Sequence, residues 1–149
     1  MRIVLQRCSR AEVRINNKVT GAIGRGFVLL VGVTDGDSQA DAERLAQKVA
    51  QMRVFEDDCG KMNLGLPEVD GQILSISQFT LYADCRKGNR PSFIRAARPE
   101  IAEPLYDYFN AVLREKYNLH VATGCFGADM QVDFVNDGPV TVLLDSAEL

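Results

Sequence analysis

The chain has 149 residues, of which 46% are hydrophobic and 25% charged, proportions typical of a globular protein with a buried core. Its longest apolar runs, such as 27–31 and 142–144, are too short to cross a bilayer, and its first residues favour a strand over a signal peptide. We therefore expect one domain over residues 1–149, a cytoplasmic location and no membrane partner.

The net charge of −3 is distributed unevenly along the chain. Residues 1–26 carry a net charge of +5, residues 86–98 carry another +5, and the remainder carries −13. An acidic protein with such local excesses of Lys and Arg can still contact phosphates through one face. A solvated surface explains the same pattern, so charge alone does not decide between the two interpretations.

The first part of the chain is predicted to form β-structure. Apolar and polar residues favour strands over residues 2–8, 12–15 and 18–23, and Asn16-Asn17 supplies the tight turn of a hairpin between the last two. Residues 27–34 are nearly all apolar and are typical of a central strand.

A helical pattern follows these strands. The apolar residues between Ser38 and Met52 fall on one stripe, and Ser38 with Asp41 is close to a capping box, so we expect a helix here. A polar loop over residues 56–63 then leads to a strand over residues 72–79.

The second half is predicted to contain one more helix and three more strands. Pro99 opens the helix, in which Pro104 is tolerable only near the first turn and a half. The buried stripe of this helix is predicted to be Ile101, Leu105, Tyr108, Phe109, Val112 and Leu113. The strands are expected near residues 120–123, 130–135 and 140–145. This order predicts a mixed α/β fold with a strongly curved sheet and two principal helices, and disfavours a doubly wound nucleotide-binding fold.

Side chains able to act as catalytic bases are scarce. His120 is the only histidine, and its position after a helix favours a capping or surface role. Asp57 and Asp58 lie in a polar loop, where a solvated acidic run is favoured over an acid–base pair.

Metal-binding and phosphate-binding motifs are also missing from the sequence. No GxxxxGK[ST] motif is present, and the glycines near residue 24 precede no helix. The four cysteines are widely spaced without a CxxC motif, so we expect free thiols and no metal or other cofactor: Cys8, Cys59, Cys85 and Cys125.

Two segments place polar or bare backbone groups beside predicted strands. Ser77-Gln78-Phe79-Thr80-Leu81 crowds two hydroxyls and an amide onto a strand end, where functional sites are commonly built. Gly138-Pro139 stands just before the apolar run 142–144, although proline lacks a backbone donor and glycine lacks a side chain. Each segment alone also fits a plain turn or local backbone hydrogen bonds.

Together, Ser77-Gln78-Phe79-Thr80-Leu81 and Asn136-Asp137-Gly138-Pro139-Val140-Thr141 resemble the two signature motifs of the D-aminoacyl-tRNA deacylases. The resemblance extends over the whole chain through Leu5-Gln6-Arg7, Arg90-Pro91-Ser92-Phe93 and Thr123-Gly124-Cys125-Phe126-Gly127-Ala128. Animal-type relatives carry Pro-Gln-Ala-Thr in the first motif, so Ser77-Gln78-Phe79-Thr80 is similar to the chiral-proofreading type.

The resemblance implies a barrel-like, mostly antiparallel sheet and a hydrolase that cleaves the ester between a D-amino acid and the terminal adenosine of tRNA. It also implies a homodimer in which Gly138-Pro139, joined by a cis peptide and braced by Arg7, enters the partner's active site and rejects L-amino acids. We expect glycyl-tRNA to be a further substrate, because glycine has no side chain that a filter against L-amino acids could exclude. Because the chain has no usable base, we expect the 2′-hydroxyl of the terminal ribose to assist the reaction. Thr80 as a nucleophile remains an alternative.

The expected site residues form three groups. The catalytic segment, which acts mainly through its backbone, consists of Ser77, Gln78, Phe79 and Thr80. The substrate pocket is expected to contain Phe126, Gly127, Ala128, Met130 and Asn136. The residues expected to contact the tRNA backbone are Arg86, Lys87, Arg90 and Arg95.

Two other functions remain open on the sequence. A non-catalytic tRNA or nucleic-acid binding module that uses residues 86–98 would bind in a salt-sensitive way and release no amino acid. An editing domain acting on L-aminoacyl-tRNA is the second alternative, because a related fold is attached to some archaeal threonyl-tRNA synthetases.

Overall fold

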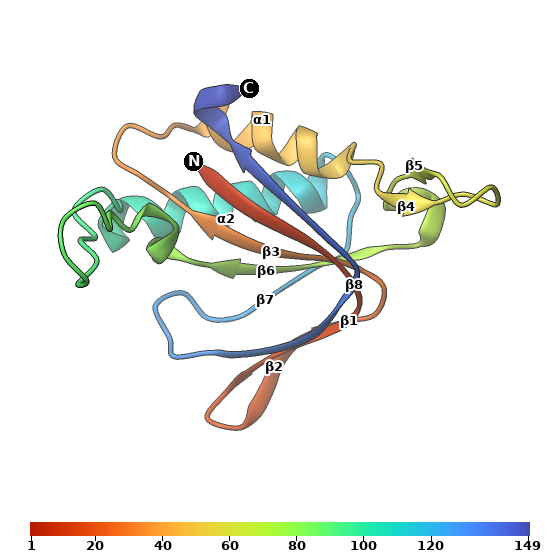
Figure 1. The fold of residues 1–149 in the computed structure, drawn as a ribbon, viewed down its shortest axis with the longest axis horizontal. Helices are drawn as coiled ribbons and strands as arrows, with labels where there is room; N and C mark the ends of the chain where they lie inside the picture. The colour runs from red at the N-terminus through yellow and green to blue at the C-terminus, as the bar shows by residue number, and fades with distance from the viewer.

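In the computed structural model, which describes residues 1–149, a curved six-stranded sheet carries two helices on one face (Figure 1). The strands of this sheet are β1 (Arg2–Ile15), β2 (Lys18–Ile23), β3 (Gly26–Gly32), β6 (Gln72–Ser77), β7 (Val121–Thr123) and β8 (Gln131–Asp145). Their order is β2-β1-β3-β6-β7, and β8 pairs with β1 outside this path. The β3–β6 and β6–β7 pairs are parallel and the pairs made by β1 are antiparallel, which confirms the expected mixed, mostly antiparallel sheet.

The two helices are α1 (Gln39–Ala50) and α2 (Pro99–Glu115). Ser38 caps α1 and forms the expected capping box with Asp41, and its hydrogen bond lowers the pKa of that carboxyl. Pro104 is the sixth residue of α2 and is exposed, so the backbone bond that it removes lies at the solvated start of the helix. No helix combines the length and the apolar character needed to cross a membrane.

The predicted buried stripe of α2 was wrong at two positions. Ile101 is half exposed and Tyr108 is only partly buried. The observed buried stripe is rotated around the helix by about one residue relative to the predicted one. The apolar residues of this segment fit a 3.6-residue period in more than one way, so the sequence pattern does not fix the exact buried face. The buried residues of α2 are Ala102, Leu105, Tyr106, Phe109, Asn110, Val112 and Leu113.

The sheet curves strongly because β1 and β8 are long and bent. The first half of β1 pairs with β3 and its second half pairs with β2, while β8 runs along both halves (Figure 1). The β1–β8 register shifts between Gln6 and Cys8 and again between Cys8 and Ala11. Our prediction of two separate strands in each segment was wrong, because the backbone stays extended and paired through these irregularities.

Two hydrophobic cores fill the two sides of the curved sheet. The larger has 27 buried residues and lies between the helices and one face of the sheet. Within it, the rings of Phe27 and Phe55 stack with their centres 5.2 Å apart. The smaller has 7 buried residues, including Cys8, and is enclosed by the β1–β2 hairpin and the first half of β8. Burial raises the pKa of Cys8 to about 11, so this thiol stays protonated and unreactive.

Shorter elements connect these parts. Asn16 and Asn17 both have positive φ values, 49° and 62°, which confirms the tight turn predicted between β1 and β2. The polar segment predicted as a loop contains the small hairpin of β4 (Phe55–Glu56) and β5 (Met62–Leu64), and η1 (Pro67–Val69) follows it. The chain ends in η3 (Ser146–Glu148).

Candidate active site

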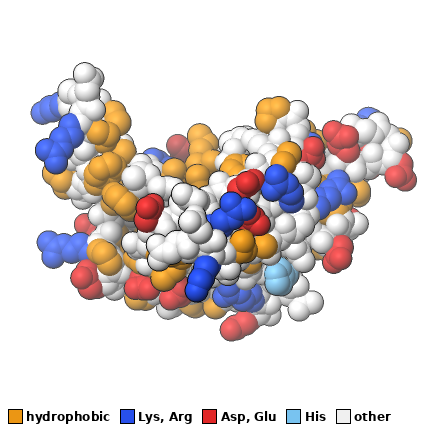
Figure 2. Space-filling view, turned by 90° about the horizontal axis from the view of Figure 1, so that it is seen from below, with side chains coloured by type: hydrophobic (Ala, Val, Ile, Leu, Met, Phe, Trp, Pro, Cys, Tyr) orange, Lys and Arg blue, Asp and Glu red, His pale blue; other side chains and the backbone are white.

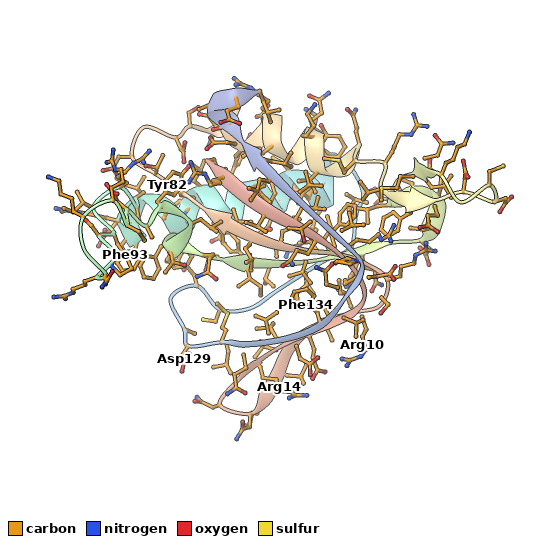
Figure 3. All side chains as sticks on the ribbon, in the orientation of Figure 1. Arg10, Arg14, Tyr82, Phe93, Asp129 and Phe134 are labelled. Atoms are coloured by element: carbon orange, nitrogen blue, oxygen red, sulfur yellow. The ribbon has the colours of Figure 1, made fainter.

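A cavity of about 630 Å³ opens at the end of the sheet where β6 stops. One wall is formed by residues 77–79, where the 3₁₀ turn η2 (Phe79–Tyr82) begins, together with residues from 93–99, and the other is formed by residues from 126–132. Figure 3 labels one residue of each wall, Phe93 above and Asp129 below, at the same end of the molecule.

The polar end of β6 forms the edge of this cavity. Ser77, Gln78 and Phe79 line it, and the Gln78 N–H donates to the Val31 carbonyl at 2.7 Å, which ties the segment to β3. We predicted a strand through Phe79, but β6 ends at Ser77 because the chain turns into η2. The Gln78 side-chain amide donates to Thr80 Oγ1 at 2.6 Å. Thr80 itself is not one of the residues that line the cavity.

The first N–H groups of η2 are suited to binding a ligand. The first amides of a helical turn have no carbonyl partner within that turn. In η2 these are the amides of Phe79 and Thr80, both exposed residues. Such donors can stabilise a negatively charged oxygen, which is the chemistry that hydrolysis of an ester requires.

Aromatic rings line both the mouth and the depth of the cavity. At the mouth, Phe79 and Phe93 pack edge to face with their ring centres 5.1 Å apart. Deeper, Phe126 packs against Tyr106 with ring centres 6.1 Å apart, and the Tyr106 hydroxyl donates to the Ser75 carbonyl at 2.7 Å. Burial raises the pKa of Tyr106, so this hydroxyl is a fixed donor and not a base.

The structure brings together four of the five predicted pocket residues. The lining includes Phe126, Gly127, Ala128 and Met130, and Gly127 has a φ of +74° that favours glycine. Asn136 lies elsewhere, with its side-chain amide against the backbone of Val140.

Sequence reasoning missed the side of the cavity that α2 supplies, which consists of Arg98, Pro99, Ala102 and Tyr106. Arg98 and Pro99 mark a helix start, and Ala102 and Tyr106 resemble ordinary core residues of an amphipathic helix. No local signal in the sequence therefore distinguishes them. They become cavity residues only because α2 packs with its first turns beside the end of β6.

The four predicted tRNA-contacting residues lie on an exposed segment at the cavity mouth. Paired backbone hydrogen bonds between Asp84 and Ser92, at 2.8 and 2.9 Å, close residues 84–92 into a loop that carries Arg86, Lys87 and Arg90, and Arg95 follows this loop. Arg86 bonds the Asp84 carboxylate through Nε and Nη2 and holds the pKa of that carboxyl well below its usual range. Lys87, Arg90 and Arg95 have no carboxylate partner. Figure 2 shows Lys and Arg side chains mixed with hydrophobic ones on the arm at its left, the end where this loop lies in Figure 1.

The Gly138-Pro139 step lies within β8, at the bend of the strand, and neither residue lines the cavity of its own chain. Both residues are exposed, and their peptide bond is cis. Arg7 is buried beneath them: its Nε donates to the Asp137 carbonyl at 3.1 Å and its Nη1 donates to the Val54 carbonyl at 2.6 Å. The guanidinium thus joins the bend of β8 to the segment that precedes β4.

Comparison with known proteins identifies the family. Residues 4–145 match the family model described as D-Tyr-tRNA(Tyr) deacylase. The chain belongs to the D-aminoacyl-tRNA deacylase family. A D-aminoacyl-tRNA deacylase of Thermus aquaticus is 56% identical over 148 residues, which cover 99% of this chain and 97% of that protein. One of Halalkalibacterium halodurans is also 56% identical, over 146 residues that cover 98% and 99% of the two chains.

Solved structures share this architecture. A structure described as c-Myc DNA Unwinding Element Binding Protein has a TM-score of 0.91 and 41% identity and covers 97% of this chain and 98% of its own. A probable eukaryotic D-amino acid tRNA deacylase has a TM-score of 0.83 at 18% identity, over 96% and 97% of the two chains, and supports the fold alone. The enzyme is thus an ester hydrolase that acts on aminoacyl-tRNA, and the alternative of a non-catalytic binding module is wrong.

This deacylase is expected to work without its only histidine. His120 is exposed at the start of β7 and does not line the cavity, so His120→Ala should hydrolyse D-aminoacyl-tRNA at a rate within about twofold of the unchanged enzyme. A catalytic base contributes about 10²- to 10⁴-fold, so a loss of that size in a steady-state assay would contradict this expectation.

Proposed function

We propose that this deacylase is a cytoplasmic chiral-proofreading enzyme, folded as one domain over residues 1–149, that works as a homodimer. In each active site, the cavity of one protomer is completed by Gly138-Pro139 of its partner. The enzyme hydrolyses D-aminoacyl-tRNA and glycyl-tRNA and excludes L-aminoacyl-tRNA. One observation carries the proposal: Gly138 and Pro139 are exposed but do not line the cavity of their own chain. A second protomer is therefore needed to bring the two together.

The makeup of the cavity supports catalysis assisted by the RNA itself. Its lining contains no His, Lys or Cys, its one carboxylate is Asp129, and the Tyr106 hydroxyl is committed to the Ser75 carbonyl. In this proposal the 2′-hydroxyl of the terminal ribose takes a proton from the attacking water and passes its own proton to the 3′-oxygen as the ester bond breaks. The amides of Phe79 and Thr80 donate to the developing oxyanion, and the aromatic walls orient the ester. Each of these effects can lower the barrier by several kcal/mol.

Backbone atoms carry the chiral selection in this proposal. Glycine allows main chain to approach the α-carbon of the substrate more closely than any residue with a Cβ. An L side chain would collide with Gly138-Pro139, whereas a D side chain points away from it and into the cavity. The selection therefore excludes the wrong hand without recognising the right side chain.

The outer surface of β8 supports a dimer that presents Gly138-Pro139. Leu143 is 71% exposed and Val135 is 43% exposed, on the strand that contains the step. Large apolar side chains exposed on both sides of a functional segment favour burial against another protein surface. A second copy of this chain, seated on that strand, brings its cavity and Gly138-Pro139 together.

Phosphate contacts are assigned to the loop at the cavity mouth. Lys87 and Arg90 on the loop and Arg95 just after it are exposed without carboxylate partners, and Arg86 is held in place by Asp84. These cations bind the backbone of the acceptor end while the cavity holds the aminoacyl ester. The binding should weaken as salt rises, because each neutralised phosphate releases counterions.

Selection by exclusion predicts indifference to the D side chain. We expect D-Tyr, D-Phe, D-Asp and glycyl esters of tRNA to be hydrolysed with kcat/KM values within about tenfold of one another, because a site that only excludes L side chains makes no specific contact with the D side chain. Purified enzyme and radiolabelled aminoacyl-tRNAs test this directly. Resistance of glycyl-tRNA would contradict exclusion, because glycine has no side chain to exclude.

A further inference from the structure

One ion pair outside the cavity contacts the turn that carries the proposed catalytic amides. Arg2, near the start of β1, donates through Nε and Nη2 to Asp145 Oδ2 at 2.9 and 2.8 Å. Its third guanidinium nitrogen, Nη1, donates to the Leu81 carbonyl of η2 at 2.9 Å. The guanidinium carbon also lies 4.8 Å from the centre of the Tyr82 ring. Every guanidinium nitrogen of Arg2 is therefore used, and two of its four contacts are to η2.

Several contacts hold η2, and Arg2 supplies the one side-chain hydrogen bond that reaches a backbone carbonyl of the turn. The turn is four residues long, and its start is tied to β3 through Gln78 and Val31. Its end packs against Gly32, where an added Cβ would lie 3.1 Å from the Leu81 Cβ. Hydrogen bonds from the Leu81 N–H to the Gln78 carbonyl at 3.4 Å and from the Ala83 N–H to the Thr80 carbonyl at 3.0 Å link the two ends of the turn, so a contact to the Leu81 carbonyl also bears on the amides at the opposite end.

Asp145 holds the guanidinium in place. It is the last residue of β8, and its carboxylate also accepts a hydrogen bond from the Ala147 N–H at 3.1 Å. Although partial burial raises the pKa of Asp145, the bonds from Ala147 and Arg2 lower it below its usual value, so the carboxylate stays charged. Figure 3 shows Tyr82 beside the first residues of β1, where this contact lies.

We propose that Arg2, held by Asp145, is a positioning residue that aims the Phe79 and Thr80 amides into the cavity. The hydrogen bonds and the ring contact of the Arg2 side chain involve Asp145, Leu81 and Tyr82, none of which lines the cavity, so Arg2 acts through η2. The catalytic part of this inference rests on the proposed role of the two amides as donors to the oxyanion. The positioning part rests on the contacts alone, and the two parts can be tested separately.

A matched ion pair provides the control. Arg10 Nη1 and Asp133 Oδ1 lie 3.1 Å apart across the same two strands, β1 and β8, but far along β1 from η2 (Figure 3). The Arg10–Asp133 pair is more exposed, with side chains 59% and 50% accessible against 35% and 17% for Arg2 and Asp145. Both pairs thus join the same strands, and only one of them reaches η2.

The test compares Arg2→Met with Arg10→Met by hydrogen exchange and by single-turnover hydrolysis of D-tyrosyl-tRNA. We expect Arg2→Met to speed amide exchange at residues 79–82 and to lower the cleavage rate about 10- to 100-fold, since misplacement by about 1 Å costs up to about 100-fold. The enzyme concentration that gives half-maximal rate should change less than about twofold. Arg10→Met should change neither exchange at residues 79–82 nor the rate.

Further variants keep the test decisive if Arg2→Met unfolds. Asp145→Asn keeps the shape and removes the charge, and should lower the cleavage rate in the same direction. Arg2→Lys should cleave faster than Arg2→Met but more slowly than the unchanged enzyme, because one ammonium group cannot bond both Asp145 and the Leu81 carbonyl in the planar geometry of a guanidinium. The double variant Arg2→Met/Asp145→Asn should lose little more than Arg2→Met alone, because both act through one contact.

The outcomes separate the inference from the proposed function. Unchanged exchange at residues 79–82 in folded Arg2→Met would overturn the inference and leave the proposed function intact. An equal loss of rate in Arg10→Met would overturn it too. Faster exchange without slower hydrolysis would overturn both, because the two amides would then not be the groups that promote the reaction.

Discussion

Replacing Gly138 with Ala is expected to lower hydrolysis of D-aminoacyl-tRNA about 100-fold, the scale of an approximately 1 Å displacement at an active site. A Cβ at this position would lie 2.9 Å from Val140 Cγ2 and 3.0 Å from Arg7 Nη2, and the φ of +125° disfavours any L side chain. The bend of β8 must therefore shift. The rate is measured under single-turnover conditions with D-tyrosyl-tRNA.

Gly36 provides the matched control for this variant. Its φ of +92° imposes a similar backbone penalty, but an added Cβ would have no atom within 4 Å. Gly36→Ala should therefore reduce stability slightly and leave the rate unchanged. A similar loss of rate in both variants would show that strain, and not the shape of the Gly138-Pro139 surface, explains the effect.

Mixed dimers then test where Gly138 acts. Ala128→Trp should inactivate the enzyme by filling the cavity, whereas Gly138→Ala leaves the cavity itself intact. If each site combines a cavity with the partner's Gly138-Pro139, co-expressed Gly138→Ala and Ala128→Trp chains regain activity, because one site of each mixed dimer is complete. Recovery of no activity would contradict sharing of the site between protomers.

A substrate that ends in 2′-deoxyadenosine is expected to be cleaved about 10²- to 10⁴-fold more slowly, the usual contribution of a general base. The cavity lining has no His, Lys or Cys to replace the missing hydroxyl, and the Tyr106 hydroxyl is already bonded, which leaves Asp129 as the one carboxylate there. The comparison uses D-aminoacyl-tRNA with either terminal nucleotide, measured by single turnover. Cleavage of both substrates at the same rate would contradict assistance by the RNA.

Thr80→Val separates this mechanism from covalent catalysis. The variant keeps the backbone amide and removes the hydroxyl, which lies outside the cavity lining and accepts a bond from Gln78. We expect a rate within about tenfold of the unchanged enzyme, whereas loss of a true nucleophile removes nearly all of the rate. Trapping of an acyl group on Thr80 would support the alternative.

Local signals in the sequence predicted much of the fold. The capping box at Ser38, the Asn16-Asn17 turn and Pro99 at the start of α2 each depend on residues a few positions apart, and each is present. The continuity of β1 and β8 was not predictable in this way. Their bent halves stay paired because two long strands hold each other across the register shifts, and this is a property of the assembled sheet.

The candidate site was predictable to the extent that it lies in short motifs. Ser77, Gln78 and Phe79 line the cavity together with residues 126–130, all of which except Asp129 were predicted site residues. Tyr106 and Arg2 carried no signal, because one resembles a helix core residue and the other resembles a surface charge. Leu81 and Asp145 are 79 and 143 positions away from Arg2 in the sequence, so these contacts exist only in the folded chain.

The chirality of the substrate provides the most direct test of the proposed selection by backbone. Purified enzyme is mixed in excess with D-tyrosyl-tRNA or L-tyrosyl-tRNA, and release of tyrosine is followed with uncatalysed hydrolysis subtracted. Exclusion of one hand by about 3 kcal/mol or more predicts that the D ester is cleaved at least about 100-fold faster. Equal rates for the two esters would contradict the proposal that Gly138-Pro139 keeps L-amino acids out of the cavity.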